Sequence, residues 1–412
     1  MLALASVQPG RVTGQRTRTV LRHAHVVQHD AVVAGPVSFA DGRVCDASPD
    51  AVPIDLPDHL IFPGLINAHD HLQLNAIPPL PQSEPFPNSY AWISAFESHL
   101  TSAAVVTAVA VPSDVRHWHG GLKNLLAGVT TVAHHDPWHH VFDRDAFPVG
   151  VLRHFGWSHS LELSESRDGA VARYGPPVAE SFNATPPHQP WIIHLAEGTD
   201  AVAMAELAGL DDLGCLAANT VLVHGTGLTR TDVARIIERG ASVVWCPSSN
   251  LRMLGLTLAP RTLFQAGRLT LGSDSRLTGS ADLLEELAVA SRRSDLSPNE
   301  LLRLVTADAR RVLRLPTVGD LAFGHNADCV IVRNEGDAYG SLVGKSRRAI
   351  RAVVRGGVPV VADPDFAEWF ARCGVETVEV TLDGVPKLLS RNVAWPEAVA
   401  LEPGLEFRDP VQ

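Results

Sequence analysis

Residues 63–73 read PGLINAHDHLQ and place two histidines, His69 and His71, one residue apart at the end of an apolar run. On a β-strand, residues i and i+2 point to the same side, so both imidazoles can be directed at one point. That is the geometry of a pair of metal ligands. The same short pattern also arises by chance where two polar residues merely end a strand, so the rest of the chain has to decide.

The apolar run before His69 is the first of a series that alternates with helical stretches, such as SADLLEELAVASRR at 280–293. This alternation predicts a parallel sheet or barrel over residues 63–318. The sequence between Trp157 and Trp191 has no convincing strand, so we expect an eighth strand to be short, irregular or missing. Seven strands can be assigned from their apolar runs: LIFPGLINA (60–68), GVTTVAHHD (128–136), VGVLRHFGW (149–157), WIIHLAEG (191–198), TVLVHGT (220–226), ASVVWCPSS (241–249) and LTLGSDS (269–275).

Both ends of the chain contain short strand-like segments separated by turn residues. VLRHAHVVQ at 20–28 and AIRAVVRGGVPVVAD at 349–363 are examples. Such segments are typical of small β structures. We therefore predict that residues 1–62 and 319–412 pair into one small β module beside the catalytic domain formed by 63–318.

The composition is that of an ordinary globular protein. Of the 412 residues 45% are hydrophobic and 19% charged, and no window of about 18 uncharged apolar residues predicts a membrane span. The net charge of -11, with basic residues spread along the chain, argues against a protein that binds nucleic acid. The N-terminus lacks the pattern of a signal peptide, and five widely spaced cysteines predict reduced thiols, so we expect a cytoplasmic protein.

Polar residues also follow three later apolar runs. His194 ends one run, with Glu197 three residues further on, and His224 and Asp274 end two others. In a barrel these positions lie at the carboxyl ends of the strands, where active sites are built. One cation satisfies several buried imidazoles and carboxylates together, whereas each of them buried separately needs its own partner. The later strand ends therefore favour the metal interpretation of the opening stretch.

The chain resembles the amidohydrolase superfamily, in the branch of cytosine, guanine and S-adenosylhomocysteine deaminases and triazine chlorohydrolases. The resemblance runs from about residue 20 to 362. It implies an α/β fold, a (β/α)8 TIM-like barrel with a small β-sandwich domain formed by both chain ends. The motifs that carry it are PGLINAHDHL, GVTTV, IHLAEG, VLVHG, CPSSNL, LGSDS and GDLAFGHNADCVIV.

The resemblance also implies a ligand set for one divalent metal, consisting of His69, His71, His194 and Asp274. Related enzymes with two metals bridge them through a carboxylated lysine. No lysine stands at a predicted strand end, so we predict a mononuclear site; the lysines are Lys123, Lys345 and Lys387. Zinc is the default ion for three imidazoles, one carboxylate and a water, with iron or manganese as alternatives.

Three residues receive catalytic roles from the same resemblance. A divalent metal lowers the pKa of bound water toward about 7, and Asp274 would orient this water and take its proton. Glu197 would carry protons to a ring nitrogen or a leaving amine. His224 would polarise the substrate group under attack and steady the tetrahedral intermediate. The alternatives are a solvated carboxylate for Glu197 and a structural or metal-ligating role for His224.

Other polar residues near the strand ends are further candidates. TTVAHHDPWHH at 130–140 is either a second metal or substrate-reading cluster, or a loop with capped and exposed histidines. The proline-rich loop AIPPLPQSEPFPNS at 76–89 is placed to act as a lid or a pocket wall. The substrate-binding candidates are Trp138, His159, Ser248, Asn250 and Arg276.

Together these features predict a metal-dependent hydrolase of non-peptide C–N bonds that deaminates a cyclic amidine or an aminated heterocycle. A hydrolase that opens a lactam or an amide is the alternative, because the same residues serve both reactions. A metal-stabilised binding protein without turnover is the third hypothesis, although such a protein has no need of Glu197. We expect a small-molecule substrate, no nucleic-acid or membrane partner, and a possible homo-oligomer.

Overall fold

Eight parallel strands form the centre of the computed structural model, which describes residues 17–28, 31–164 and 174–408. They form two sheets, with the spatial orders β10-β9-β8 and β11-β12-β13-β14-β15. The prediction about a signal peptide rests on N-terminal residues outside the described ranges. The strands are β8 (Leu65–Asp70), β9 (Val129–His134), β10 (Gly150–Val151), β11 (Gly156–Ser160), β12 (Trp191–Leu195), β13 (Thr220–His224), β14 (Ser242–Trp245) and β15 (Leu269–Leu271).

The edge strands β8 and β15 of the two sheets lie next to each other. The backbone N–H of Asp274, just past β15, donates a hydrogen bond to the carbonyl oxygen of His69 in β8 at 3.0 Å. The approach is close, because a Cβ at Gly272 would lie 2.7 Å from the backbone nitrogen of His69. A glycine at this position therefore allows β15 to bring Asp274 beside the histidines of β8.

The third predicted strand is wrong in its extent. Residues 149–157 form two strands, β10 and β11, separated by a bend at His154. Arg153 and His154 interrupt the apolar run there, and β11 itself reads GWSHS, which carries little apolar signal. The eighth strand, expected to be short, irregular or missing, is thus the five-residue β11, which begins at Gly156.

Helices follow most of these strands. The helix α7 begins with a capping box between Thr229 and Asp232 and ends at Gly240, whose φ of 74° suits a glycine. The bounds are α1 Ser89–His99, α2 Ala103–Ala110, α3 Ser113–Leu126, α4 Leu161–Ser164, α5 Val178–Ala184, α6 Ala201–Asp212, α7 Arg230–Arg239, α8 Pro247–Leu254, α9 Arg261–Gln265, α10 Leu283–Arg293, α11 Pro298–Leu304, α12 Ala307–Val312, α13 Ala367–Arg372 and α14 Pro396–Leu401. Short 3-10 helices are η1 Leu72–Leu74, η2 His140–Asp143, η3 Arg347–Ala349 and η4 Pro364–Phe366.

Strands from both chain ends share one sheet, in which β7 pairs antiparallel with β16. Its order is β21-β19-β20-β18-β17-β16-β7-β2-β3, and a second sheet has the order β5-β4-β1-β6. The first part contributes β1 Thr19–Arg22, β2 His25–Val27, β3 Val32–Ala34, β4 Val37–Ala40, β5 Arg43–Cys45, β6 Val52–Asp55 and β7 His59–Pro63. The last part contributes β16 Cys329–Arg333, β17 Ile350–Arg355, β18 Val358–Ala362, β19 Thr377–Leu382, β20 Val385–Ser390 and β21 Leu405–Phe407.

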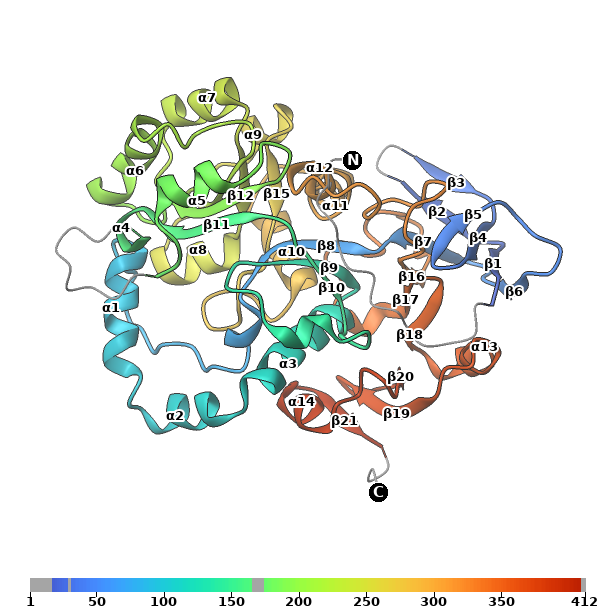
Figure 1. Ribbon diagram of the computed structural model, residues 1–412. Coiled ribbons are helices and arrows are strands. Elements are labelled where there is room, and N and C mark those ends of the chain that lie inside the picture. The colour runs from blue at the N-terminus through green and yellow to red at the C-terminus, as the bar shows by residue number, and fades with distance from the viewer. Residues whose placement is uncertain (1–16, 29–30, 165–173, 409–412) are drawn as a thin grey trace.

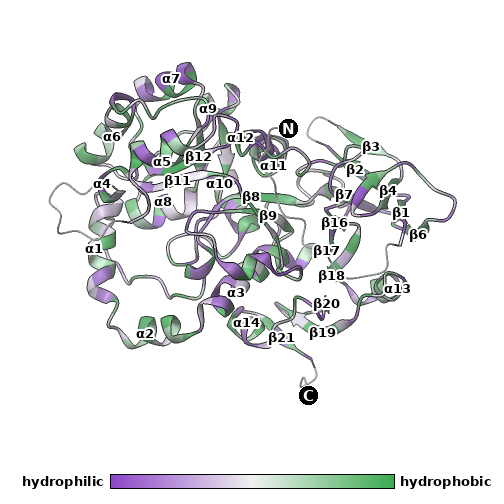
Figure 2. Cartoon of the chain, in the orientation of Figure 1, coloured by the Kyte–Doolittle hydropathy of each residue, from purple (hydrophilic) through white to green (hydrophobic). Residues whose placement is uncertain are grey.

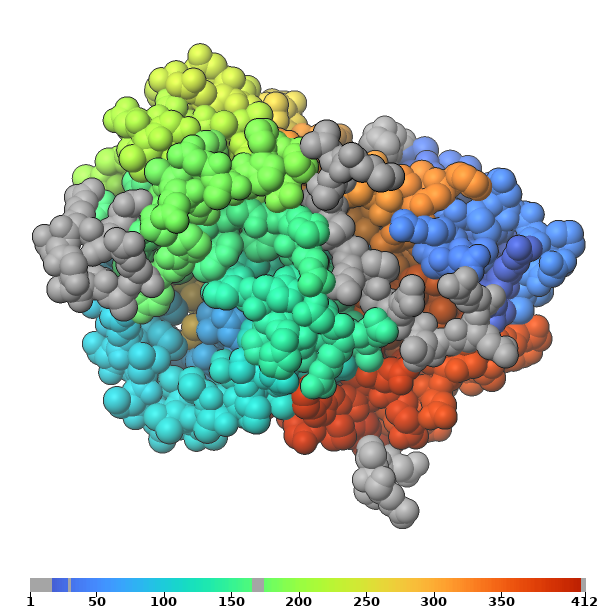
Figure 3. Space-filling view, viewed as in Figure 1, coloured from blue at the N-terminus to red at the C-terminus, as the bar shows by residue number. Residues whose placement is uncertain are grey.

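The blue N-terminal strands and the orange and red C-terminal strands lie on one side of the molecule, and the parallel strands with their helices lie on the other (Figure 1). The surfaces of the two chain ends also adjoin in the space-filling view (Figure 3). In Figure 2, helices such as α6 and α7 carry hydrophobic and hydrophilic residues side by side, as expected where one helix face is buried.

A buried ion-pair network joins the C-terminal segment to the parallel strands. Glu402 follows α14, and its carboxylate accepts hydrogen bonds from Arg276, just past β15, at 2.7 and 2.8 Å and from His119 of α3 at 2.8 Å. Arg347 also pairs with it. Burial alone would raise the pKa of Glu402, but these donors hold that pKa well below its usual range. The carboxylate is thus a paired buried charge.

Among the described helices, no single one is long and apolar enough to cross a membrane. By length and composition alone the pair α1 and α2 could do so together, but it is bent by 89° at the break between the helices.

Candidate metal and catalytic site

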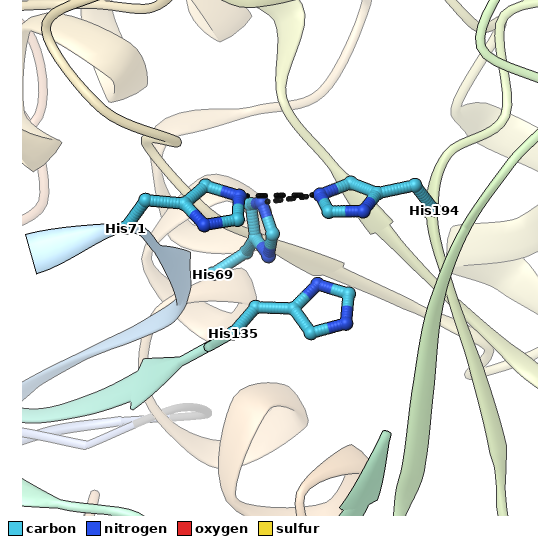
Figure 4. Close-up of side chains that lie close together, drawn as sticks. All are labelled: His69, His71, His135 and His194. Atoms are coloured by element: carbon cyan, nitrogen blue, oxygen red, sulfur yellow. Dashed lines mark hydrogen bonds between the residues drawn. The ribbon is translucent and has the colours of Figure 1, made fainter. Parts of the chain in front are cut away.

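Polar residues converge at the carboxyl ends of the parallel strands. Their ligand atoms form two overlapping groups, within each of which the atoms lie no more than 4.8 Å apart. All of these side chains are buried. The close-up in Figure 4 shows the imidazole rings of the first group gathered around one space. The first group is His69, His71, His135 and His194, and the second is His69, His224 and Asp274.

The centre of the first group is Nε2 of His194. This atom lies 3.2 Å from Nε2 of His71 and 3.3 Å from Nε2 of His69. Oδ1 of Asp274 lies 3.7 Å from Nε2 of His69 and 3.8 Å from Nε2 of His71. Such spacings suit ligands that each lie about 2 Å from one ion.

Hydrogen bonds orient two of these imidazoles. Nδ1 of His194 donates to the carbonyl oxygen of His159 at 2.7 Å, so Nε2 of His194 can present a lone pair to the group. Nδ1 of His71 lies 2.7 Å from the carboxylate of Asp136. Burial lowers the pKa of His71, but Asp136 outweighs this effect and raises the pKa to about 9. Burial lowers the pKa of His69 to about 4.

Asp274 is held in one orientation. The hydroxyls of Ser249 and Thr278 both donate to its Oδ2 at 2.7 Å, and the backbone N–H of Ser275 donates to its Oδ1 at 2.8 Å. Burial by itself would raise the pKa of Asp274, but the contact with His69 keeps this pKa well below the usual range. Asp274 is therefore an ionised carboxylate with one oxygen directed at the histidines.

Three residues at these strand ends have a strained backbone. Ala196, His224 and Asp274 have φ values of 52°, 76° and 53°. Positive φ is uncommon for residues other than glycine, and such residues cluster at functional sites, where the surrounding structure holds them in place. The strain at three strand ends therefore supports a functional role for this region.

Glu197 and His224 form a pair beside the histidine group. Nε2 of His224 lies 3.3 Å from Oε1 of Glu197, and Nδ1 of His224 lies 2.8 Å from Oδ1 of Asn250. The Asn250 amide nitrogen donates to Thr257, so its oxygen faces His224 and accepts from it. The contact between Glu197 and His224 is attractive only when a proton lies between them. Burial raises the pKa of Glu197, which favours a proton there, although His224 acts in the opposite direction.

A divalent cation fits this arrangement. Three imidazole nitrogens and the ionised Asp274 converge in a buried space, and without a cation the nitrogens at 3.2 and 3.3 Å must share protons. Imidazole and carboxylate groups are ligands of zinc and of other first-row divalent metals. The buried cluster can therefore hold a divalent metal.

Trp138 and His159 lie near the group but outside it. Trp138 is partly exposed, and it lines a cavity of about 110 Å³ together with Asp136 and Trp157. The guanidinium of Arg153 lies 4.6 Å from the centre of the Trp138 ring. The ring of His159 lies 4.8 Å from that of His194, and burial lowers the pKa of His159 to about 4.

Ser248, Asn250 and Arg276 are placed differently from one another. The Ser248 backbone N–H donates to Glu286 at 2.9 Å, and Asn250 orients His224 as described above. The guanidinium of Arg276 is engaged by Glu402 and by the carbonyl oxygen of Ala281, so the structure does not bring it to the histidine group. None of this tests substrate binding, which stays a prediction for these three residues.

The chain matches the model of the amidohydrolase family over residues 171–360. It is 24% identical to the 5-methylthioadenosine/S-adenosylhomocysteine deaminase of Pyrococcus furiosus, over 74% of this chain and 82% of the relative. It is 25% identical to the 8-oxoguanine deaminase of Pseudomonas aeruginosa, over 73% of this chain and 82% of that protein. The resemblance to the amidohydrolases is confirmed. These matches also confirm the prediction of a hydrolase that acts on C–N bonds.

Solved structures of similar fold agree with the family match. An adenosine deaminase from Xanthomonas campestris with bound zinc has a TM-score of 0.63 and 20% identity, over 87% of this chain and 97% of that one. The atrazine chlorohydrolase from Arthrobacter aurescens TC1, complexed with zinc, has a TM-score of 0.65 and 20% identity, over 84% of this chain and 95% of that one. At this identity the likeness concerns the fold.

The sequence pattern contains no clear signal for the role of His135 or Asp136. Both lie just past β9, where His135 enters the histidine group and Asp136 contacts His71. Lys123 was considered only as a possible metal bridge. It lies in α3, fully buried, and forms an ion pair at 3.0 Å with Asp70, the residue between the two histidines of the opening stretch.

The histidines around positions 134 to 140 separate into two sets. His135 joins the buried group, whereas His139 and His140 lie with Asp114 in a group that is partly exposed. Arg144 also lies 3.7 Å from Asp114 and provides that carboxylate with a cation. The interpretation as a capped or exposed loop thus describes His139 and His140, but not His135.

The proline-rich segment 76–89 contacts the backbone at Glu197, and its role as a lid or pocket wall stays a prediction. The backbone N–H of Ser89 donates to the carbonyl oxygen of Glu197 at 2.9 Å, and that of Thr199 donates to Pro87 at 2.8 Å. Further along the segment, the N–H of Phe86 donates to Met253 of α8. The segment is therefore hydrogen-bonded to the backbone of Glu197 and of Thr199, two residues further on.

Proposed function

We propose that the chain is a mononuclear, metal-dependent aminohydrolase that deaminates a cyclic amidine or an aminated heterocycle. The observation that carries this proposal is the convergence of three imidazole nitrogens and one ionised carboxylate beside a buried Glu197–His224 pair. The ligands would be His69, His71, His194 and Asp274, and zinc is the ion that this set favours. The match to the amidohydrolase family and the names of the relatives support the same reaction class.

A bound divalent cation would supply an activated water near neutral pH, because it lowers the pKa of that water toward about 7. Asp274 is held for proton uptake by two hydroxyl donors on Oδ2, which leave Oδ1 directed at the site. A carboxylate fixed in this way is preorganised, because it needs no reorientation when it accepts a proton.

Glu197 would move a proton to the leaving amine. Its carboxyl is buried, and burial raises its pKa, so it retains a proton to higher pH than an exposed glutamate does. His224, fixed by Asn250 through Nδ1, faces the same carboxyl with Nε2 and, in its doubly protonated form, would donate from Nε2 to the substrate group under attack. A general acid placed in this way contributes about 10² to 10⁴ in rate.

We also propose the finer architecture that the resemblance implies. The eight parallel strands would close into a (β/α)8 barrel, which the contact between β8 and β15 supports. Residues 1–62 and 319–412 would form one β-sandwich module beside the barrel of 63–318, which the pairing of β7 with β16 supports. A cytoplasmic location, a homo-oligomer and the lack of nucleic-acid and membrane partners stay predictions.

The test is ammonia release from a panel of aminated heterocycles and cyclic amidines by the zinc-loaded protein. The proposal expects ammonia with an equimolar carbonyl product, and a loss of about 10² to 10⁴ in kcat/KM for Glu197→Gln at unchanged zinc content. Glu84→Gln, which alters an exposed carboxylate in the wall segment, is the matched control and should keep full activity. Release of a carboxylate without ammonia would favour lactam or amide opening instead. Zinc binding without turnover of any compound would favour the binding protein.

A further inference from the structure

We propose that His135 is a fifth protein ligand of the cation, in addition to the four ligands that the family resemblance implies. This inference rests on the proposed function, since it concerns the same ion. It assigns His135 to the site and raises the number of imidazoles at the ion from three to four. The ligand atom of His135 already belongs to the group formed with His69, His71 and His194.

His135 lies just past β9, and no other proposed ligand comes from this strand. It follows β9 directly, its side chain is 1% exposed, and its backbone N–H donates to the carbonyl oxygen of Asp70 at 3.1 Å. Its ring centre lies 4.4 Å from that of His194 and 5.2 Å from that of His69. In Figure 4 the ring of His135 lies beside these two rings, with one of its nitrogens toward them.

The tautomer of His135 follows from one hydrogen bond. Nε2 lies 3.0 Å from the carbonyl oxygen of Ser158 in β11, and a carbonyl oxygen only accepts, so Nε2 carries the hydrogen. In the neutral imidazole Nδ1 then carries a lone pair. Nδ1 is buried and has no hydrogen-bond partner among the residues that the structure describes. A buried acceptor without a donor is unfavourable, and a cation removes the deficit.

The same hydrogen-bonding arrangement is found in His194, one of the four ligands already proposed. His194 also donates one ring N–H to a backbone carbonyl, that of His159, and directs its other nitrogen at the group. Ligating histidines almost always have such an outer partner for the second nitrogen. His135 therefore has the outer hydrogen bond of a metal ligand as well as the position of one.

The neighbouring His134 provides a contrast. Its Nδ1 accepts a hydrogen bond from the backbone N–H of Leu72 at 3.2 Å, so the nitrogen left over is an N–H donor that cannot bind a cation. That ring packs edge-on against Phe142 and His117, outside the ligand group. Of these two adjacent buried histidines, therefore, only His135 has a ring nitrogen whose lone pair is not used in a hydrogen bond.

A fifth protein ligand changes what coordination the ion can have. Zinc sites with four ligands are tetrahedral, whereas a site with four imidazoles and a carboxylate has at least five protein donors. Such a number suits ions that accept five or six ligands, such as divalent iron, cobalt or manganese, as well as a zinc ion that expands its shell. The coordination number of a bound probe ion is therefore the property to measure.

The experiment uses the full-length protein loaded with cobalt(II), whose visible absorption strengthens as its coordination number falls. His135→Gln is the main variant, because its amide can keep an N–H donor toward Ser158 while the lone pair of Nδ1 is lost. We expect stronger cobalt bands in this variant and cobalt binding weaker by at least tenfold in a chelator competition. His135→Ala is the second variant, in which added imidazole should restore the original spectrum. His117→Ala, which removes a buried imidazole outside the group, should leave the spectrum and affinity unchanged.

An unchanged cobalt spectrum and affinity in folded His135→Gln and His135→Ala would overturn the proposal. A further variant, His69→Ala, separates this outcome from a failure of the proposed function. If wild-type protein binds cobalt and His69→Ala does not, an unchanged His135→Gln rejects only the fifth ligand. If binding does not depend on His69 at all, the proposed metal site fails, and the fifth ligand fails with it.

Discussion

The Asp136 carboxylate lies 2.7 Å from Nδ1 of His71, although the two residues come from different strands. Such a contact fixes the tautomer and the ring direction of a ligating histidine and makes its other nitrogen more basic. Burial alone would lower the pKa of His71, and Asp136 instead raises it to about 9. At pH 7 the ion-free His71 therefore carries a proton, which must leave when Nε2 binds a cation.

Asp136→Asn should weaken metal binding by about 10- to 100-fold, because the ring of His71 loses its outer partner. Cation uptake at pH 7 should also release fewer protons in this variant, since the pKa of His71 falls when the carboxylate is neutralised. Chelator competition measures the affinity, and a pH indicator in weak buffer measures the protons. The exposed Asp145→Asn should change neither value. Equal affinities in the wild-type protein and Asp136→Asn would show that Asp136 does not support a ligand.

Lys123→Met should lower the free energy of unfolding by about 3 to 5 kcal/mol, because it leaves the buried charge of Asp70 without its cation. The ammonium of Lys123 also donates a hydrogen bond to Asn75 at 2.8 Å. Urea unfolding followed by circular dichroism is the measurement. Lys345→Met, which removes an exposed pair with Glu335, should change stability by less than about 1 kcal/mol. Similar small effects in both lysine variants would refute a structural role for the buried pair.

Glu206 should make stability decrease between about pH 4.5 and pH 7. Burial raises its pKa from the ordinary 4.5 to about 7, although Tyr90 and the Ala196 N–H, which donate to it, act in the opposite direction. The folded protein therefore holds a proton that the unfolded chain releases in this window, and ionised Glu206 destabilises the fold above pH 7. The shift corresponds to roughly 3 kcal/mol.

Glu206→Gln removes this ionisation. Relative to the wild-type protein, the variant should gain roughly 2 to 3 kcal/mol in unfolding free energy when the pH is raised from 5 to 8. Urea unfolding at the two pH values measures the difference. Glu180→Gln on the exposed face of α5 should show no such gain. A constant difference between Glu206→Gln and wild type at both pH values would argue against a buried, proton-holding carboxyl.

Much of the convergence at the site was predictable from local pattern. His194 and His224 each end an apolar run, and the alternation of runs with helices indicates parallel strands whose carboxyl ends meet. The residues that lie outside such runs were harder to place. Asp274 stands three residues past β15, and its position depends on the close approach of Gly272 to His69.

Other features depend on distant contacts that leave no local signal. Three polar residues follow one another at 134–136, and which of them faces the site depends on irregular pairing of β8 with β9. Arg276 stands at a strand end, as a substrate residue does, but it pairs with Glu402, 126 positions later. The strand β11 was missed because GWSHS has too few apolar residues to be recognised by hydrophobic pattern.

We infer that His69, His71, His194 and Asp274 hold one divalent cation. The most direct measurement is metal content by plasma mass spectrometry, on protein purified without added metal, beside His69→Ala and the control His117→Ala. We expect about one equivalent of divalent metal per chain in the wild-type protein and in His117→Ala, and loss of that metal in His69→Ala. Metal retained in full by His69→Ala, or two equivalents in the wild-type protein, would contradict a single ion at this site.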